Sequence, residues 1–365
     1  MNRKVSLAFA LLMLMVLVVA APVAQAQDLT KVRVVLQWVA QAQFAGYYAA
    51  DAMGYYADAG LEVEITPGGP DISADQIVAA GEAEFGVRPF VTTLAAREGG
   101  ADFVSIARVN QVPPTLLVSF KSAGITSPED LRGHNIGSWL GGNEMEEFAL
   151  LRQFNIDPDK DVTIVKQGFD MSQLINGEVE VAQATIYNEF AQLLETVNPD
   201  TGELYTIDDL NVISVRDYGI NTLQDNIFAR ESWLAEDGNE ATALAFVQAT
   251  LKGWIYCRDN AEDCVGIVLD AGTALGESHQ LWMMNEINNL LWPAPNGIGI
   301  LNTGEEYNQT VEIAKTYSLI TADPDPAVFR TDIVEQAVAN LEAEGLDVKG
   351  LDFKKMEVTL NPGGE

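Results

Sequence analysis

The chain has 365 residues, of which 48% are hydrophobic and 20% charged, and its formal net charge is -32 at pH 7. This length suits two domains, and this hydrophobic share is enough to form large buried cores. The acidic residues are spread along the chain, which indicates a solvated exterior that repels nucleic acid and anionic membrane surfaces. We therefore expect no nucleic-acid partner.

The N-terminus has the pattern of a secretory signal peptide. Arg3 and Lys4 precede an apolar run over residues 7–19, which is short for a membrane span, and residues 24–26 read Ala-Gln-Ala, a cleavage pattern. We expect residues 1–26 to be removed and the protein to be exported, to the periplasm or the outer face of the cell membrane. An uncleaved anchor is the alternative.

The segment that follows predicts a strand, a loop, a helix and a second strand. The strand covers residues 32–38, the helix residues 45–60 and the second strand residues 61–65, with a Gly-rich turn at residues 67–71. Ligands bind beyond the carboxyl ends of strands in open α/β sheets. The loop there offers amides and aromatic rings, with no nucleophile, metal-binding set or phosphate loop. This is typical of a site that holds a flat polar molecule.

Strands and helices continue to alternate along the chain, which predicts an α/β fold. A second unit begins near Lys121, and the chain returns to the first from Asn221, with crossings near Ser119 and Tyr218. We expect two lobes, each a mostly parallel sheet flanked by helices. Lobe 1 is predicted to comprise residues 27–119 and 220–365, and lobe 2 to comprise residues 120–219.

The only two cysteines are Cys257 and Cys264. On one continuous helix they would stand about 10 Å apart, too far for a disulfide. Residues 258–260 read as a helix end followed by an N-cap, so the chain is expected to turn there and allow a local disulfide in an exported protein. The alternative is a pair of buried thiols.

Four segments carry a resemblance to a known family: residues 36–69, 81–87, 127–137 and 226–234. They resemble periplasmic substrate-binding proteins of ABC importers, in particular the NMT1/THI5-like group, whose importers take up thiamine pyrimidine precursors, riboflavin and related compounds. The resemblance implies a type II periplasmic-binding-protein fold whose lobes close on a ligand. It also implies an ABC permease and a separate ATPase subunit as partners, with no cofactor on this chain.

The same family includes pyrimidine synthases that consume their own active-site histidine and carry a Cys-rich iron-binding motif. This chain has no Cys-rich motif, and its two histidines, His134 and His279, lie far apart in the sequence. Metal sites need convergent clusters. We expect both histidines to be structural, no metal site and no enzyme activity.

The candidate ligand-binding residues share a position at predicted strand ends or crossings. They are Gln37, Trp38, Gln43, Phe44, Arg88, Asn110, Gln111, Gly142, Asn143, Tyr187, Asn188, Glu189 and Tyr218. The aromatic rings would stack on a ligand, the amides and Glu189 would hydrogen-bond a ring edge, and Arg88 would bind a carbonyl or carboxylate. Backbone N–H groups at Gly142 and Asn143 would face an anionic or carbonyl group. Core packing, a salt bridge, a helix cap and hinge packing are the alternatives.

These features predict a monomeric, exported binding protein for a small heteroaromatic vitamin or vitamin precursor. Riboflavin is favoured because the aromatic residues near strand ends suggest a wide flat slot. The alternatives are, in order, a thiamine pyrimidine precursor, then nitrate, sulfonate or taurine, then an enzyme of the synthase type. A carrier of anions would need a strongly cationic pocket, and Arg88 is the only basic candidate.

Overall fold

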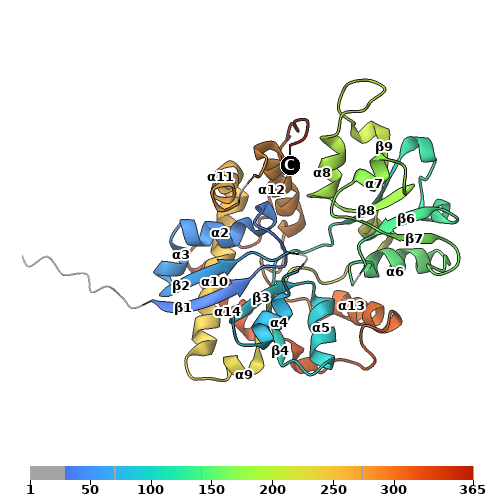
Figure 1. The fold of residues 1–365 in the computed structure, drawn as a ribbon. Coiled ribbons are helices and arrows are strands. Elements are labelled where there is room, and N and C mark those ends of the chain that lie inside the picture. Colours follow the sequence, from blue (N-terminus) through green and yellow to red (C-terminus); the bar gives the residue numbers. More distant parts are fainter. Residues whose placement is uncertain (1–28, 70, 141, 273, 365) are drawn as a thin grey trace, which may run out of the picture.

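The structure is a computed structural model that describes residues 29–69, 71–140, 142–272 and 274–364. The expected signal peptide, residues 1–26, lies outside the described residues. Two lobes, each built on a five-stranded sheet with helices packed around it, lie side by side (Figure 1). None of the helices in these ranges has the length and apolar character needed to cross a membrane.

The sheet of lobe 1 has the strand order β2-β1-β3-β10-β4. Its strands are β1 (Thr30–Val35), β2 (Leu61–Thr66), β3 (Phe85–Arg88), β4 (Phe103–Arg108) and β10 (Asn226–Arg230). β1 pairs in parallel with β2, with Thr30 opposite Leu61, and also with β3. β10 runs antiparallel to β3 and β4. Four strands therefore share one direction, and the strand that arrives from the other lobe runs the opposite way.

The sheet of lobe 2 repeats this plan with the order β7-β6-β8-β5-β9. Its strands are β5 (Thr115–Phe120), β6 (Asn135–Ser138), β7 (Thr163–Lys166), β8 (Val181–Thr185) and β9 (Leu210–Ser214). β6 pairs in parallel with β7 and β8, while β5 runs antiparallel to β8 and β9. The prediction of an α/β protein with two mostly parallel sheets is thus confirmed.

Helices cover both sheets. Those of lobe 1 are η1 (Ala42–Phe44), α2 (Ala45–Ala52), α3 (Tyr55–Asp58), α4 (Ala74–Ala79), α5 (Phe90–Glu98), α9 (Glu231–Leu234), α10 (Asn239–Asp259), α11 (Ala261–Ala271), α12 (Glu277–Leu291), η6 (Pro326–Val328) and α14 (Thr331–Ala343). Those of lobe 2 are η2 (Lys121–Ala123), η3 (Pro128–Leu131), α6 (Met145–Gln153), α7 (Ser172–Ile175), α8 (Glu189–Leu194), η4 (Ile207–Asp209) and η5 (Val215–Tyr218). α13 (Glu305–Thr316) packs against α5 of lobe 1 and α6 of lobe 2.

The two chain crossings join the carboxyl edges of the sheets. β4 and β9 both end at such an edge, and the chain then enters the other lobe as β5 or β10, each antiparallel to its neighbours. The carboxyl edges must therefore face each other. The first crossing lies at residues 109–114, because β5 belongs to the sheet of lobe 2. The boundary expected after Ser119 falls inside β5 and is placed too late, since the sequence does not reveal with which sheet that apolar strand pairs.

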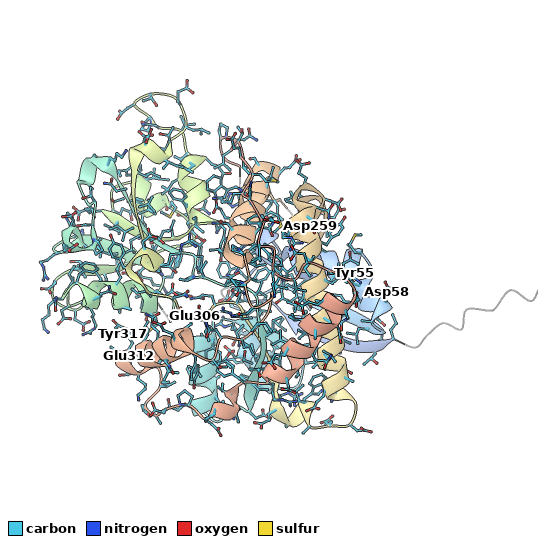
Figure 2. The ribbon with its side chains drawn as sticks, turned by 180° about the vertical axis from the view of Figure 1, so that it is seen from behind. Tyr55, Asp58, Asp259, Glu306, Glu312 and Tyr317 are labelled. Carbon is cyan, nitrogen blue, oxygen red and sulfur yellow. A yellow bond between two sulfur atoms is a disulfide. The ribbon has the colours of Figure 1, made fainter. Side chains whose placement is uncertain are left out.

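Two C-terminal helices extend the contact between the lobes. Figure 2 shows Glu306, Glu312 and Tyr317 along and just beyond α13, beside lobe 2, and Ile313 of this helix is buried in a core cluster of lobe 2. α12 packs against α8, and Leu360 of the C-terminal tail contacts the cluster that includes α8. The expected assignment of residues 220–365 to lobe 1 thus includes segments that also contact lobe 2.

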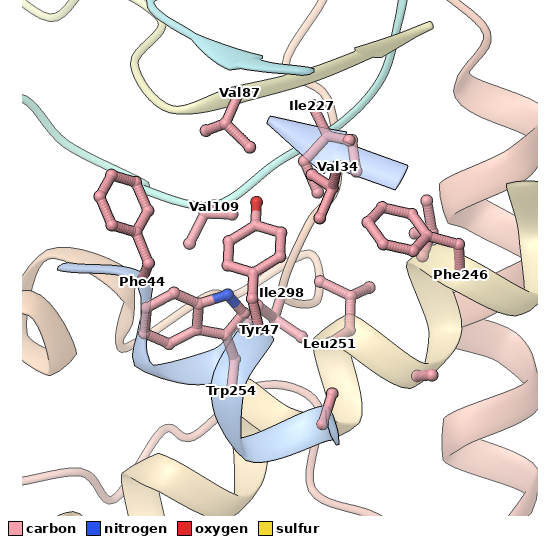
Figure 3. Packing of buried hydrophobic residues seen from close by; sticks show 14 of the residues in the cluster. Val34, Phe44, Tyr47, Val87, Val109, Ile227, Phe246, Leu251, Trp254 and Ile298 are labelled. Carbon is pink, nitrogen blue, oxygen red and sulfur yellow. The ribbon is translucent and has the colours of Figure 1, made fainter. Parts of the chain in front are cut away.

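A close helix crossing fixes the start of α2, which directly follows the first strand's loop. Tyr47 of α2 meets Trp254 of α10 edge to face, with ring centroids 6.3 Å apart (Figure 3). Gly46 and Gly253 lie where the helices touch: a Cβ atom on Gly253 would stand 2.1 Å from the backbone oxygen of Gly46. Only a hydrogen atom fits at these two positions.

The local disulfide expected between the two cysteines is formed. Beyond α10, the chain turns at Asn260, and Cys257 and Cys264 are bonded with a Cα–Cα distance of 5.4 Å.

Gly253→Ala is expected to destabilise the protein by about 1–3 kcal/mol, because the added methyl group overlaps the α2 backbone. Urea unfolding followed by circular dichroism measures the loss. Gly266→Ala in α11 is the matched control, since a Cβ atom there meets nothing within 4 Å among the described residues. That variant should gain up to about 1 kcal/mol from helix propensity. Equal stability of the two variants would contradict this account of the crossing.

Candidate ligand-binding site

Aromatic side chains meet between the lobes on the side away from the crossings. Trp38 follows β1 and Phe169 follows β7, and their ring centroids are 5.0 Å apart with planes tilted by 50°. Trp139, after β6, donates from Nε1 to the Gly168 carbonyl at 2.9 Å. The crossings leave from β4, β5, β9 and β10 on the other side of the sheets. The lobes therefore touch both at the crossings and opposite them, which is a closed arrangement.

The Gly-rich turn after β2 holds the loop that carries Trp38. The backbone N–H of Gly68 donates to the Trp38 carbonyl at 2.8 Å. A Cβ atom on Gly68 would lie 2.2 Å from the Leu36 backbone oxygen, so no other residue allows this approach. Gly68 of the expected turn thus fixes the backbone beside the tryptophan.

Asp225, just before β10, is the centre of a buried polar group. Its carboxylate accepts a hydrogen bond from Gln37 Nε2, and Gln43 lies close enough to favour its charged form. Burial nevertheless raises the pKa of Asp225 from 3.8 to about 6. Burial raises the pKa of both phenols, Tyr187 of lobe 2 and Tyr47 of lobe 1, well above 10. The Asp225 charge adds to the shift of each, after the effect of Tyr56 in the case of Tyr47. The site thus brings together residues from both lobes and a crossing.

The residues that follow β8 form the lobe 2 side of this group. Glu189 accepts hydrogen bonds from the Thr185 N–H at 2.9 Å, from the Thr185 hydroxyl at 2.6 Å and from Asn188 Nδ2 at 2.7 Å. Burial raises the pKa of Glu189. Tyr187 packs in the hydrophobic core cluster of lobe 1 although it belongs to lobe 2. Tyr187, Asn188 and Glu189 therefore all lie at the contact between the lobes.

Glutamates occupy the amino-terminal end of α6. The Gly142 N–H donates to the Glu144 carboxylate at 2.8 Å, so this amide already has an acceptor. Glu147 is fully buried, and burial raises its pKa to about 8. Glu146, also buried, accepts hydrogen bonds from Thr222 and Gln224 of the second crossing. This helix end is thus filled by carboxyl groups of the chain itself.

Several other predicted residues lie outside this group. Asn143 is exposed, and its carbonyl accepts a hydrogen bond from Gln183 Nε2 at 2.7 Å. Phe44 is buried in the lobe 1 core near Tyr47 (Figure 3). Tyr218 packs edge to face on Phe154 of lobe 2, with centroids 5.3 Å apart. These rings take the core-packing and hinge-packing roles that were the alternatives for aromatic candidates.

The arginines at the ends of β3 and β4 face carboxylates. Arg88 Nε lies 3.5 Å from Asp75 Oδ2, and Arg108 Nη1 lies 2.5 Å from Glu306 Oε2. Gln111 accepts a hydrogen bond from Arg108 at 3.2 Å. Asn110 is buried, and its Oδ1 atom has no hydrogen-bond partner among the described residues. Neither arginine is thus a free cation for an anionic ligand.

One important residue was missed by the sequence analysis, and another has the structural role that was predicted for it. Asp225 is absent from the predicted site residues, although its position before a strand at a crossing was a usable signal. His279 read as structural, and it is buried with both ring nitrogens bonded. His134 pairs with Glu180 at 3.0 Å nearer the surface. In the part of the chain that the structure describes, no three His, Cys, Asp or Glu residues gather to hold a metal ion.

The family model described as NMT1/THI5 like matches residues 41–263. The chain belongs to this family. It is similar to the riboflavin-binding protein RibY of Chloroflexus aurantiacus, with 27% identity over 88% of this chain and 88% of that protein. It is also similar to the formylaminopyrimidine-binding protein of Halalkalibacterium halodurans, with 23% identity over 67% of this chain and 71% of that protein. The expected family membership is confirmed.

The family also includes enzymes. The 4-amino-5-hydroxymethyl-2-methylpyrimidine phosphate synthase of Legionella pneumophila is 28% identical over 41% of this chain, and the match spans 47% of that enzyme. Among solved structures, the aliphatic sulphonate binding protein SsuA of Escherichia coli has a TM-score of 0.61 at 15% identity, covering 92% of this chain and 97% of its own. At this identity the likeness concerns the fold alone, which is that of periplasmic binding proteins.

Asp225→Asn is expected to stabilise the protein at pH 8 by about 2–3 kcal/mol. The folded state binds the Asp225 proton more tightly than the unfolded chain, so wild-type stability falls as pH rises from 3.8 to about 6 and stays low above that. Asparagine removes this titration. Urea unfolding at pH 8 and pH 4.5 measures the free energy of unfolding of variant and wild type. The difference between the two should be smaller at pH 4.5. The same difference at both pH values would contradict the raised pKa.

Proposed function

We propose that this protein is the exported binding component of an ABC importer, and that it captures a small heteroaromatic vitamin or vitamin precursor without chemically changing it. The observation that carries the proposal is the meeting of the two carboxyl edges. Trp38 and Phe169 approach each other from opposite lobes, while the buried carboxyl groups of Asp225 and Glu189 lie on lobe-facing segments. Aromatic walls with a few convergent polar groups are typical of small-molecule sites.

The polar groups favour a ligand that donates hydrogen bonds and carries no negative charge. Asp225 and Glu189 offer acceptors for ring N–H, amine or hydroxyl groups. Arg88 and Arg108 already face carboxylates, and Glu144 accepts from the N–H of Gly142. A nitrate or sulfonate would enter a site that contains buried carboxyl groups, and the arginines at these strand ends are already paired. Burial of its negative charge there would be costly. This favours a neutral heteroaromatic compound over an anion.

We favour riboflavin as the ligand. The similarity to RibY extends over 88% of this chain, and the rings of Trp38, Trp139 and Phe169 lie close to one another around one loop. A thiamine pyrimidine precursor is the second candidate, supported by the similarity to the formylaminopyrimidine-binding protein. In either case the lobes close on the ligand by rotation about the crossings. The monomeric closed form delivers the ligand to a permease that a separate ATPase subunit drives.

A pyrimidine synthase is the rival from a different class, because several relatives carry that name. The synthases of the family need a Cys-rich iron-binding motif, whereas both cysteines of this chain form one disulfide. Incubation with iron and pyridoxal phosphate tests the rival. We expect no pyrimidine product, and its formation would overturn the binding function.

Titration of purified protein with riboflavin should quench the flavin fluorescence at micromolar concentrations, because the isoalloxazine ring stacks on indole. Trp38→Leu should weaken the affinity about tenfold. Tyr205→Leu is the matched control: this half-buried ring of lobe 2 contacts Phe120, at the end of β5, and neither Trp38 nor Phe169 is its ring partner.

Equal affinity of wild type and Trp38→Leu would remove Trp38 from the site. Absence of quenching would exclude riboflavin. In that case 4-amino-5-hydroxymethyl-2-methylpyrimidine is titrated, and its binding is monitored by the tryptophan fluorescence of the protein. Nitrate and an alkanesulfonate are expected not to bind. Binding of either anion in place of both ring compounds would overturn the proposed ligand class.

A further inference from the structure

α12 of lobe 1 is bonded to the segment of lobe 2 that carries the site residues Tyr187 and Glu189. Trp282 donates from Nε1 to the Ile186 carbonyl at 3.0 Å, and its ring contacts Phe190 with centroids 6.3 Å apart. One turn earlier on α12, His279 is almost completely buried. This contact joins the lobes directly, without passing through either crossing.

A chain of hydrogen bonds leads from His279 to Glu189. His279 Nε2 lies 2.9 Å from Asn188 Oδ1, and Asn188 Nδ2 donates to Glu189 Oε1 at 2.7 Å. The other ring nitrogen, Nδ1, lies 2.9 Å from Glu195 Oε2. The imidazole is therefore held at both nitrogens by side chains of the opposite lobe.

The network fixes where the protons lie. Asn188 must turn its NH₂ group toward Glu189, because a carboxylate only accepts hydrogen bonds. Its oxygen then faces His279, so the proton of that bond is carried by Nε2. One further proton lies between Nδ1 and Glu195. Each bond in the chain thus has one donor and one acceptor, and none can be reversed alone.

We propose that His279 is a positioning residue, which holds the Glu189 carboxylate toward the ligand through Asn188 when the lobes are closed. This rests on the proposed function, because the orientation of Glu189 matters only if it faces a ligand. The imidazole comes from lobe 1 and both of its partners from lobe 2, so the bonds exist only while α12 and α8 are in contact. Closure of the lobes and the orientation of Glu189 are therefore linked.

A double-mutant cycle on ligand affinity tests the relay. With riboflavin or 4-amino-5-hydroxymethyl-2-methylpyrimidine as the probe, His279→Leu should weaken binding about tenfold, the order expected when a buried hydrogen bond is lost. The same change should have little effect in a Glu189→Gln background, because the group that it orients is already altered. His279→Gln should recover part of the affinity, since its amide can donate to Asn188. His134→Leu is the control and should bind as wild type.

Additive effects of the two changes would overturn the positioning role, because a general loss of structure acts equally in both backgrounds. Hydrogen exchange of the backbone amides of residues 186–190, measured without ligand, gives a second readout. Faster exchange in His279→Leu than in His134→Leu supports the relay, and equal exchange overturns it. Failure of wild type to bind either probe would overturn the proposed ligand class alone, and the exchange result then decides the relay.

Discussion

Both connections between the lobes join a carboxyl edge to a carboxyl edge, and this constraint determines where a ligand can bind. A strand that enters a sheet from its carboxyl side must run against the others, which is why β5 and β10 are the antiparallel strands of their sheets. Every loop after a parallel strand then points toward the other lobe. The first crossing is short, residues 109–114, which favours the rotation of the lobes that we propose for ligand closure.

Burial of carboxyl groups destabilises the closed form. Asp225 and Glu147 have pKa values raised to about 6 and about 8 by burial, and burial also raises the pKa of Glu189. On the proposed function, a ligand with N–H or O–H groups adds hydrogen bonds to the Asp225 and Glu189 carboxylates, and it therefore favours the closed form more than the open one. A ligand can shift the balance between two forms only through such a difference in affinity.

The sequence predicted the fold better than the site. Alternating short apolar strands and helices are local patterns, and they were sufficient for two α/β lobes. The pairing of β5 is not local, so the first boundary was misplaced at Ser119. Trp38 and Phe44 both follow the first strand, but Phe44, directly before α2, packs into the core of lobe 1. Its direction depends on how α2 is rotated about its own axis, which the sequence pattern alone did not show. The bond between Gln37 and Asp225 joins residues 188 positions apart, and one sequence does not reveal such pairs.

The second crossing is held from both sides, which gives the site a fixed end and a moving end. From α13, Thr310 accepts the Leu223 N–H at 3.0 Å, while Glu146 of lobe 2 accepts from Gln224 at 2.9 Å. Asp225 follows directly, before β10. Trp38 and Phe169 lie away from the crossing strands, where the proposed rotation about the crossings would produce the largest displacement. On the proposed function, a ligand would therefore meet the Asp225 carboxylate while the lobes are apart, and the aromatic rings would cover it last.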